Sequence, residues 1–109
     1  MLAWLTNWWY GTPNKALISL SRTYGETFQL FVDKTMITTL TRDAICHFVS
    51  ELKKNTSEES SVTGIGPNFA GIRAITGGNI EFFIDSEIIY MTPNDQEHRD
   101  ELIEVLSLV

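Results

Sequence analysis

Few side chains in this sequence have the chemistry of a catalytic group, and their spacing keeps them apart. Cys46 and His47 are neighbours in a predicted helix, so their side chains point about 100° apart and cannot form a thiolate–imidazole pair with each other. We therefore expect Cys46 to be a packing residue and His47 a solvated one. The single cysteine leaves no intrachain disulfide and no multi-cysteine zinc site.

His98 and the glycines at 64 and 66 are the remaining candidates. His98 lies three residues from Asp95 and three from Glu101, a spacing that allows charge pairing on a helix, but no second histidine is placed to share a metal. Gly64-x-Gly66 lacks the preceding strand and following helix that a phosphate-binding loop requires. We predict no catalytic residue, no metal site and no cofactor.

The distribution of charge is more informative than these motifs. The 109 residues include 14 acids and 8 bases, a net charge of −6. Residues 1–57 hold six bases and four acids, a balance of +2, whereas residues 58–109 hold ten acids and two bases, a balance of −8. An acidic half repels phosphate, which disfavours direct nucleic-acid binding and favours a cationic protein partner. Solubility is the alternative reason for such acidity.

Acidic side chains of the second half are predicted to form a binding surface. Four carboxylates share one side of the C-terminal helix, where like charges repel by roughly 0.2–0.5 kcal/mol per close pair and Arg99 points away. Three more lie on the preceding hairpin, beside two aromatic side chains that would serve as anchors if exposed. The predicted partner-binding residues are Glu81, Phe83, Asp85, Glu87, Tyr90, Glu97, Asp100, Glu101 and Glu104.

Two helices are predicted from apolar residues at helical spacing. The first covers Thr41–Asn55 and has lysines in its last turn. The second covers Pro93–Ser107, with Thr92 as its cap, its proline in the first helical position and Asp95 as a capping-box acid. The core-facing residues are Ile45, Phe48, Val49 and Leu52 in the first helix and Leu102, Val105, Leu106 and Val109 in the second.

Three apolar runs between the helices predict an antiparallel meander. The runs are Phe69–Ile75, Ile80–Ile84 and Glu87–Met91, joined by a three-residue loop at Gly77-Gly78-Asn79 and a two-residue turn at Asp85-Ser86. This register puts Ala70, Ile72, Ala74, Ile80, Phe82, Ile84, Ile89 and Met91 on the core face, and Glu81, Phe83, Ile88 and Tyr90 on the other.

The N-terminal half predicts a related arrangement. Phe28–Val32 and Lys34–Leu40 form a predicted hairpin that turns at Asp33-Lys34. Ala16–Arg22 alternates like a strand, although a helix is the alternative. With the strand, the chain reads βββα twice. The polar stretch from Asn55 to Asn68 is predicted to be a loop.

Length and composition fit one domain. The chain weighs 12.4 kDa, with 43% hydrophobic and 20% charged residues. No apolar run approaches the ~20 residues of a membrane helix, and the first ten residues lack the basic start of a secretory signal. We predict a single α+β domain over residues 1–109, with one antiparallel sheet of five to six strands packed by two helices.

The aromatic cluster Trp4, Trp8, Trp9 and Tyr10 is expected to cover an open side of the sheet, the alternative being an exposed patch for a partner.

In class and layout, and in the general character of Trp4-Leu5-Thr6-Asn7-Trp8-Trp9-Tyr10-Gly11, the chain resembles an immunity protein of a contact-dependent growth inhibition or related polymorphic toxin system. The resemblance implies a cytoplasmic, non-enzymatic inhibitor, monomeric when free, that binds one cognate toxin. Many such toxins are nucleases with basic substrate clefts, which the acidic half would cover.

Two other functions stay open. A phage-type acidic mimic would use the same carboxylates to bind a host nucleic-acid-binding protein. A small enzyme or ligand-binding domain would instead have a site around His47, Cys46 or His98, assembled by the fold. Neither a membrane nor direct nucleic acid is expected as a partner.

Overall fold

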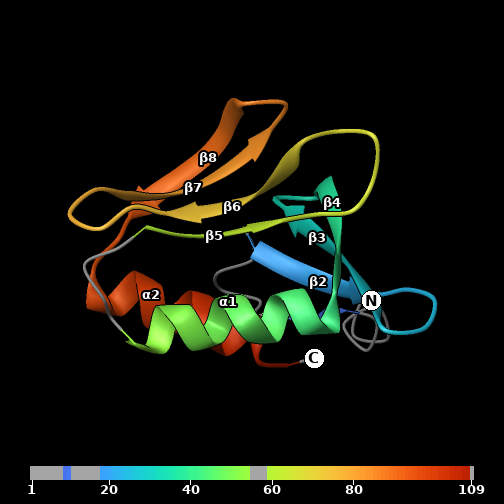
Figure 1. Cartoon of the computed structure of the whole chain (residues 1–109), viewed down its shortest axis with the longest axis horizontal. Helices are drawn as coiled ribbons and strands as arrows, with labels where there is room; N and C mark the ends of the chain where they lie inside the picture. The colour runs from blue at the N-terminus through green and yellow to red at the C-terminus, as the bar shows by residue number, and fades with distance from the viewer. Residues whose placement is uncertain (1–8, 11–17, 55–58, 109) are drawn as a thin grey trace, which may run out of the picture.

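Two antiparallel sheets and two helices form one compact α+β domain (Figure 1). The structure is a computed structural model, and it describes residues 9–10, 18–54 and 59–108. The first sheet has the strand order β1-β2-β3-β4 and the second β5-β6-β7-β8. The elements are β1 (Trp9–Tyr10), β2 (Ile18–Arg22), β3 (Thr27–Val32), β4 (Thr35–Thr41), α1 (Arg42–Lys54), β5 (Ser60–Thr63), β6 (Ala70–Ala74), β7 (Asn79–Ile84), β8 (Glu87–Pro93) and α2 (Gln96–Leu106).

The α+β class with antiparallel strands and two helices is confirmed, but the strands are divided differently from the prediction. The described residues form two sheets of four strands each, instead of one sheet of five to six. Ser60–Thr63, predicted to be loop, is the strand β5 and pairs with β6. Ile18–Arg22 is a strand, so the helical alternative is excluded over these residues. The aromatic cluster near the N-terminus, residues 55–58 and Val109 lie outside the residues whose side chains are described.

The second half repeats the strand pairing of the first at a constant difference in residue number, the repeat offset. Ile18 pairs with Val32 as Ala70 pairs with Ile84, because 18 + 52 = 70 and 32 + 52 = 84. The same offset relates the pairs of β3–β4 to those of β7–β8, including the bulge after Leu30 and the bulge after Phe82. The described pairs of β1–β2 likewise match pairs of β5–β6. The predicted double βββα pattern is therefore a structural duplication, ββββα twice.

Hydrogen bonds outside the sheets obey the same offset. Thr23 N donates to Thr27 O at 3.0 Å, and Ile75 N donates to Asn79 O at 2.9 Å. Few side chains preserve this repeat. Between residues 18–41 and 70–93, the identical pairs at the repeat offset are Gly25/Gly77, Phe31/Phe83, Asp33/Asp85 and Ile37/Ile89.

Both hairpins turn where predicted. The central residues Asp33, Lys34, Asp85 and Ser86 all have positive φ, between 48° and 72°, as a two-residue turn that matches strand twist requires. Four residues, 75–78, separate β6 from β7, and Ile75 N donates to Asn79 O, so the three turn residues inside this bond are 76–78 rather than 77–79. Ala70, Ile72 and Ala74 are buried as expected. Asn79 belongs to β7.

The bulge in β8 overturns the predicted faces of that strand. Phe82 pairs with Tyr90 instead of Ile89, because Ile89 is the extra residue opposite the β7 strand. Tyr90 is therefore half-buried with its ring 5.6 Å from that of Phe82, while Ile89 and Met91 are exposed. After the bulge, each residue of β8 faces the side of the sheet opposite to the predicted one.

Helix α1 and its apolar face are confirmed, whereas the predicted start of α2 was wrong. The N-cap of α2 is Asp95, whose side chain accepts a bond from His98 N, and neither Thr92 nor Pro93 is helical. Proline is tolerated at this position because β8 is an edge strand. Leu102, Val105 and Leu106 are buried as predicted.

Each helix packs against a strand of the other repeat's sheet, and α1 also contacts β4 of its own. Helix α1 contacts β5 of the second sheet, α2 contacts β2 of the first, and the two helices contact each other. Figure 1 shows both helices along one side of the molecule, with β8 the strand of the second sheet farthest from them. One core cluster includes buried residues of both sheets and both helices.

A substitution at Gly71 tests the close contact between β5 and β6. A Cβ at this position would collide with the backbone carbonyl of Val62 in the neighbouring strand β5. We expect Gly71→Ala to lower the free energy of unfolding by about 1–3 kcal/mol, the usual cost of overpacking. Urea unfolding monitored by circular dichroism measures the loss. Ser19→Ala, at the matching position of the first repeat, is the control. Equal midpoints for the two variants would contradict the tight β5–β6 contact.

Candidate protein-binding surface

The outer side of α2 carries the acidic residues predicted for it. Glu97, Asp100 and Glu104 are exposed and Glu101 is half-buried. Asp100 accepts a hydrogen bond from Gln96 Nε2 at 2.7 Å. Among the described residues, Glu97 and Glu104 have no ion-pair partner within 4.0 Å. Arg99 donates from Nε to Asn94 Oδ1 at 3.2 Å.

The last turns of the two helices differ in charge, although the helices occupy matching places in the duplication. Helix α1 has Asp43 in its first turn and Lys53 and Lys54 in its last turn, where each charge is favourable to the helix dipole. Helix α2 has no basic residue in its last turn, and Glu104 stands near the negative end of its dipole. The carboxylate of Glu104 is therefore electrostatically unfavourable to the helix that carries it.

The hairpin acids lie away from α2. Asp85 and Glu87 are exposed at the β7–β8 turn, and Asp85 Oδ1 accepts a hydrogen bond from Phe69 N at 3.1 Å. Figure 1 shows this turn at the end of the second sheet that is far from both helices. The predicted acids thus belong to separate places: the α2 face, the hairpin turn and the outer face of the sheet.

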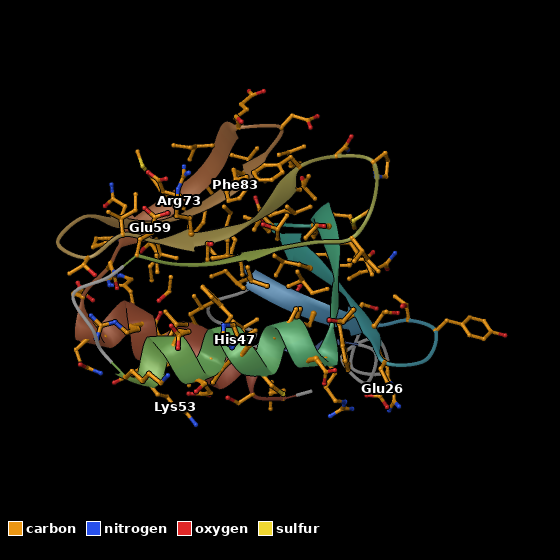
Figure 2. All side chains as sticks on the ribbon, in the orientation of Figure 1. Glu26, His47, Lys53, Glu59, Arg73 and Phe83 are labelled. Carbon is orange, nitrogen blue, oxygen red and sulfur yellow. The ribbon has the colours of Figure 1, made fainter. Side chains whose placement is uncertain are left out.

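Phe83 and Tyr90 are not the exposed anchors that the sequence suggested. Phe83 is only 4% exposed but stands outside the main core cluster. It is covered by Phe69, with ring centroids 5.8 Å apart, and by the Arg73 guanidinium, 5.3 Å from its ring centroid. Figure 2 shows Arg73 and Phe83 together on the second sheet.

The same outer face holds a well-protected ion pair between Arg73 and Glu81. Arg73 Nη2 and Nε donate to Glu81 Oε1 at 2.8 and 3.0 Å, across adjacent strands. The Glu81 side chain is 12% exposed, against 70% for Glu26 in its pair with Arg42. Glu81 is consequently neutralised within the molecule, and its charge is not free for a cationic partner.

Sequence reasoning missed the exposed apolar side chains beside this ion pair. Phe69, Ile88, Ile89 and Met91 are 61%, 42%, 38% and 56% exposed. Only the bulge explains two successive exposed isoleucines in a strand, and a period-2 pattern cannot reveal a bulge. We name these four residues the β8 apolar patch. These exposed apolar side chains make the region around β8 a candidate for contact with another molecule.

His98 has a local structural role. Its Nδ1 lies 2.6 Å from Asp95 Oδ1, the same oxygen that accepts the His98 backbone N–H at 2.9 Å. The hydrogen bond that the Asp95 carboxylate accepts from the His98 ring raises the pKa of His98 above 6.5. The backbone bond from His98, followed by its side-chain bond, lowers the pKa of Asp95 below 3.8. This pair caps the helix, which is the charge pairing expected from the spacing.

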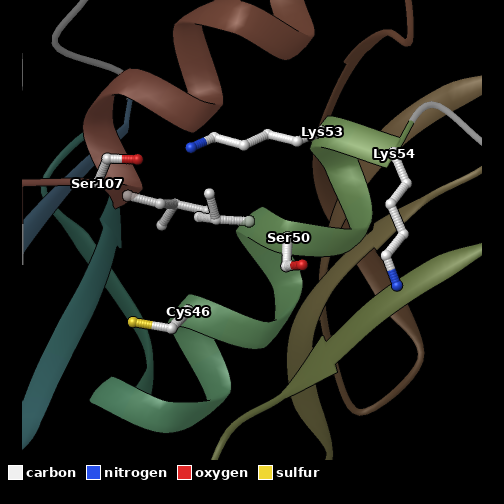
Figure 3. A pocket seen from close by; sticks show the side chains of 7 residues that line it. Cys46, Ser50, Lys53, Lys54 and Ser107 are labelled. Carbon is white, nitrogen blue, oxygen red and sulfur yellow. The ribbon is translucent and has the colours of Figure 1, made fainter.

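A groove between the helices contains the single cysteine. The groove encloses about 530 Å³ and is lined by Cys46, Val49, Ser50, Lys53, Lys54, Leu106 and Ser107. In Figure 3, the Lys53 side chain extends towards α2 while Lys54 points away from it. Cys46 is exposed rather than packed, and no histidine lines this groove. His47 is exposed on α1, so the structure does not combine Cys46 with either histidine here.

Across the described part of the chain, no three His, Cys, Asp or Glu side chains gather as a metal-binding group. The two helices are also too short and too polar to cross a bilayer.

Comparison with known proteins returned no matching family model, no matching curated protein and no matching solved structure.

Asp95→Asn tests the His98 pair, because asparagine keeps the N-cap but removes the charge. We expect the pKa of His98 to fall towards 6.5 in this variant, measured by NMR titration of its ring protons. A raised pKa in the folded state means that protonated His98 stabilises the fold below pH 6.5, and this contribution is lost as the pH rises through the folded pKa. The pKa of Asp95 is lowered in the folded state, so ionised Asp95 stabilises the fold above pH 3.8. This stabilisation is lost as the pH falls through the pKa that Asp95 has in the folded state.

The wild type should therefore exceed Asp95→Asn in Tm by more at pH 5.5 than at pH 8.5. An unchanged His98 titration, or equal Tm differences at both pH values, would disprove the interaction.

Proposed function

We propose that this protein is a non-enzymatic inhibitor that binds a basic protein toxin in the cytoplasm. The toxin would belong to a contact-dependent growth inhibition or related polymorphic toxin system, and a nuclease is the favoured kind. The resemblance supplies the system, and the surface of α2 supplies the chemistry of recognition.

The observation that carries this proposal is the acidic face of α2, whose last turn, unlike that of α1, carries no basic residue. Glu97, Asp100 and Glu104 are exposed on one helix face, and the last turn carries no base. In α1, the equivalent turn carries Lys53 and Lys54. Solubility alone does not require Glu104 near the unfavourable end of the helix dipole, whereas a cationic partner would stabilise it and relieve the repulsion along this face.

The protein would inhibit the toxin by occupying its substrate-binding cleft. Carboxylates aligned along a helix would occupy the places that substrate phosphates take in a basic cleft, and thereby exclude the substrate. Such a surface also accelerates the encounter with a basic protein, and this acceleration weakens as salt screens the charges.

Affinity capture from the native cell tests the proposal. The tagged protein is washed at low and then at moderate salt, and the retained partner is assayed for its own activity with and without added inhibitor. We expect one basic partner at a stoichiometric amount, whose toxic activity is blocked. Recovery of no partner, or of a partner that keeps its full activity, would refute the inhibitor function.

Two triple variants with the same net charge test whether the acidic face of α2 is the binding surface. Glu97→Gln, Asp100→Asn and Glu104→Gln together should weaken partner binding about tenfold, because close charge pairs each contribute up to about 1 kcal/mol at exposed sites. The control combines Glu26→Gln, Asp43→Asn and Glu51→Gln, so that both proteins have a net charge of −3, from −6 + 3. Equal affinities measured by calorimetry would show that only net charge matters and that α2 is not the surface.

The identity of the captured partner also separates the alternatives. A host nucleic-acid-binding protein that loses its nucleic acid would indicate an acidic mimic rather than a toxin inhibitor. The enzyme alternative would require a small molecule that binds near His47, Cys46 or His98. The groove between the helices is the place to look, and it includes Cys46 but neither histidine.

A further inference from the structure

We propose that the open edge of β8 binds an extended segment of another protein as an added antiparallel strand, with basic residues at the C-terminal end of that segment. The proposal stands on the duplication and on the β8 apolar patch. It requires no contact with α2, so it is independent of the inhibitor function.

The first repeat shows how such an edge is closed. Strand β4 is the edge of the first sheet, and Ile65 N donates to the Thr39 carbonyl at 2.8 Å across that edge. Thr39 and Ile65 form an antiparallel bridge. Strand β4 also contacts β6 and β7 of the second sheet, and Ile37 is only 4% exposed. The second repeat thus covers the edge strand of the first.

The repeat offset identifies Met91 as the position in β8 that is equivalent to Thr39. Thr39 pairs with Gln29 as Met91 pairs with Glu81, so the Met91 carbonyl points away from β7, as the Thr39 carbonyl points away from β3. No bond from another described residue to the Met91 backbone crosses this edge. Ile89, the counterpart of the buried Ile37, is 38% exposed.

The sequence counterpart of Ile65 cannot act as an equivalent donor. At the repeat offset, Ile65 corresponds to Pro13, whose nitrogen carries no hydrogen and so cannot donate a bridge of this kind. Edge strands with free backbone groups and apolar side chains pair readily with another polypeptide. The edge of β8 therefore presents both the hydrogen-bonding groups and the apolar side chains that strand addition uses.

The negative charge of the protein determines which kind of segment can pair with the β8 edge. A second copy of this chain would bring another net charge of −6 to the same edge, which disfavours pairing between copies. Glu87 begins β8 and Asp85 precedes it, both exposed. In an antiparallel addition, the C-terminal end of the incoming segment lies opposite Glu87, which is why its basic residues belong there.

Only a short part of β8 can form backbone hydrogen bonds with an added strand. The bulge at Ile89 interrupts the ladder at one end, and Pro93, which has no N–H, limits it at the other. Backbone pairing is therefore concentrated around Met91, and contacts with Phe69 and Ile88 must supply much of the affinity. This geometry favours a segment with large apolar side chains at alternate positions.

A synthetic peptide tests the edge directly. The probe is an acetylated octapeptide of alternating valine and threonine that ends in lysine and arginine, titrated into the ¹⁵N-labelled full chain. We expect saturable shifts of β8 amides and slower hydrogen exchange of the Met91 amide. A peptide that ends in two glutamates instead should bind about fivefold more weakly, because two exposed charge pairs are lost.

Two variants establish the mode of binding. Met91→Pro removes the N–H at the proposed bridge position and should abolish binding, since proline is tolerated on an edge strand but donates nothing. Ile88→Lys should also abolish it. Met36→Lys, at the matching position of β4, is the control and should bind as the wild type does.

Each contrary result overturns the proposal. These results are the absence of β8 shifts at saturating peptide, equal binding by Met91→Pro and wild type, or equal binding of the basic and acidic peptides. A dimer of the free protein that Ile88→Lys dissociates would show that a second copy is the occupant instead. Because the probe is a peptide, these results leave capture of a toxin through α2 unaffected, and the two proposals fail separately.

Discussion

The fold depends on one arrangement: the helix of each repeat packs against a strand of the other repeat's sheet. A half of about 50 residues is close to the lower limit at which a chain builds an independent core. The solution is an exchange in which α1 lies against β5 and α2 against β2. The single core cluster with residues of all these elements is the result. Among the described residues, the outer face of the second sheet and the edge of β8 take no part in this exchange.

Local chemistry made much of the fold predictable. Asp33-Lys34 and Asp85-Ser86 define their turns through residues that interrupt apolar runs, and Phe48 and Leu52 define α1 through their spacing. What could not be predicted depends on tertiary context. Asp95, rather than Thr92, begins α2 because β8 continues through Pro93, which no periodicity indicates. The division into two sheets follows from a duplication that very few identical side chains mark in the sequence.

The candidate surface was predictable only in its charge. The acids of α2 could be read from helical spacing, and the structure exposes Glu97, Asp100 and Glu104 together. The aromatic part was wrong because a single bulged residue turns Tyr90 inward, and because Arg73 and Phe69 cover Phe83. Sequence alternation reports which residues share a face only as long as the ladder is uninterrupted.

The helix exchange has a consequence for synthesis of the chain on the ribosome. Strand β2 ends at Arg22 and its covering helix α2 ends at Leu106, so every element from β3 to β8 is synthesised between them. At ordinary rates of translation, roughly 4 to 17 seconds separate these two residues. During that time the apolar side of the nascent first sheet has no α2 to cover it. The molecule is therefore a poor candidate for folding half by half, and its native core closes only when α2 has left the exit tunnel.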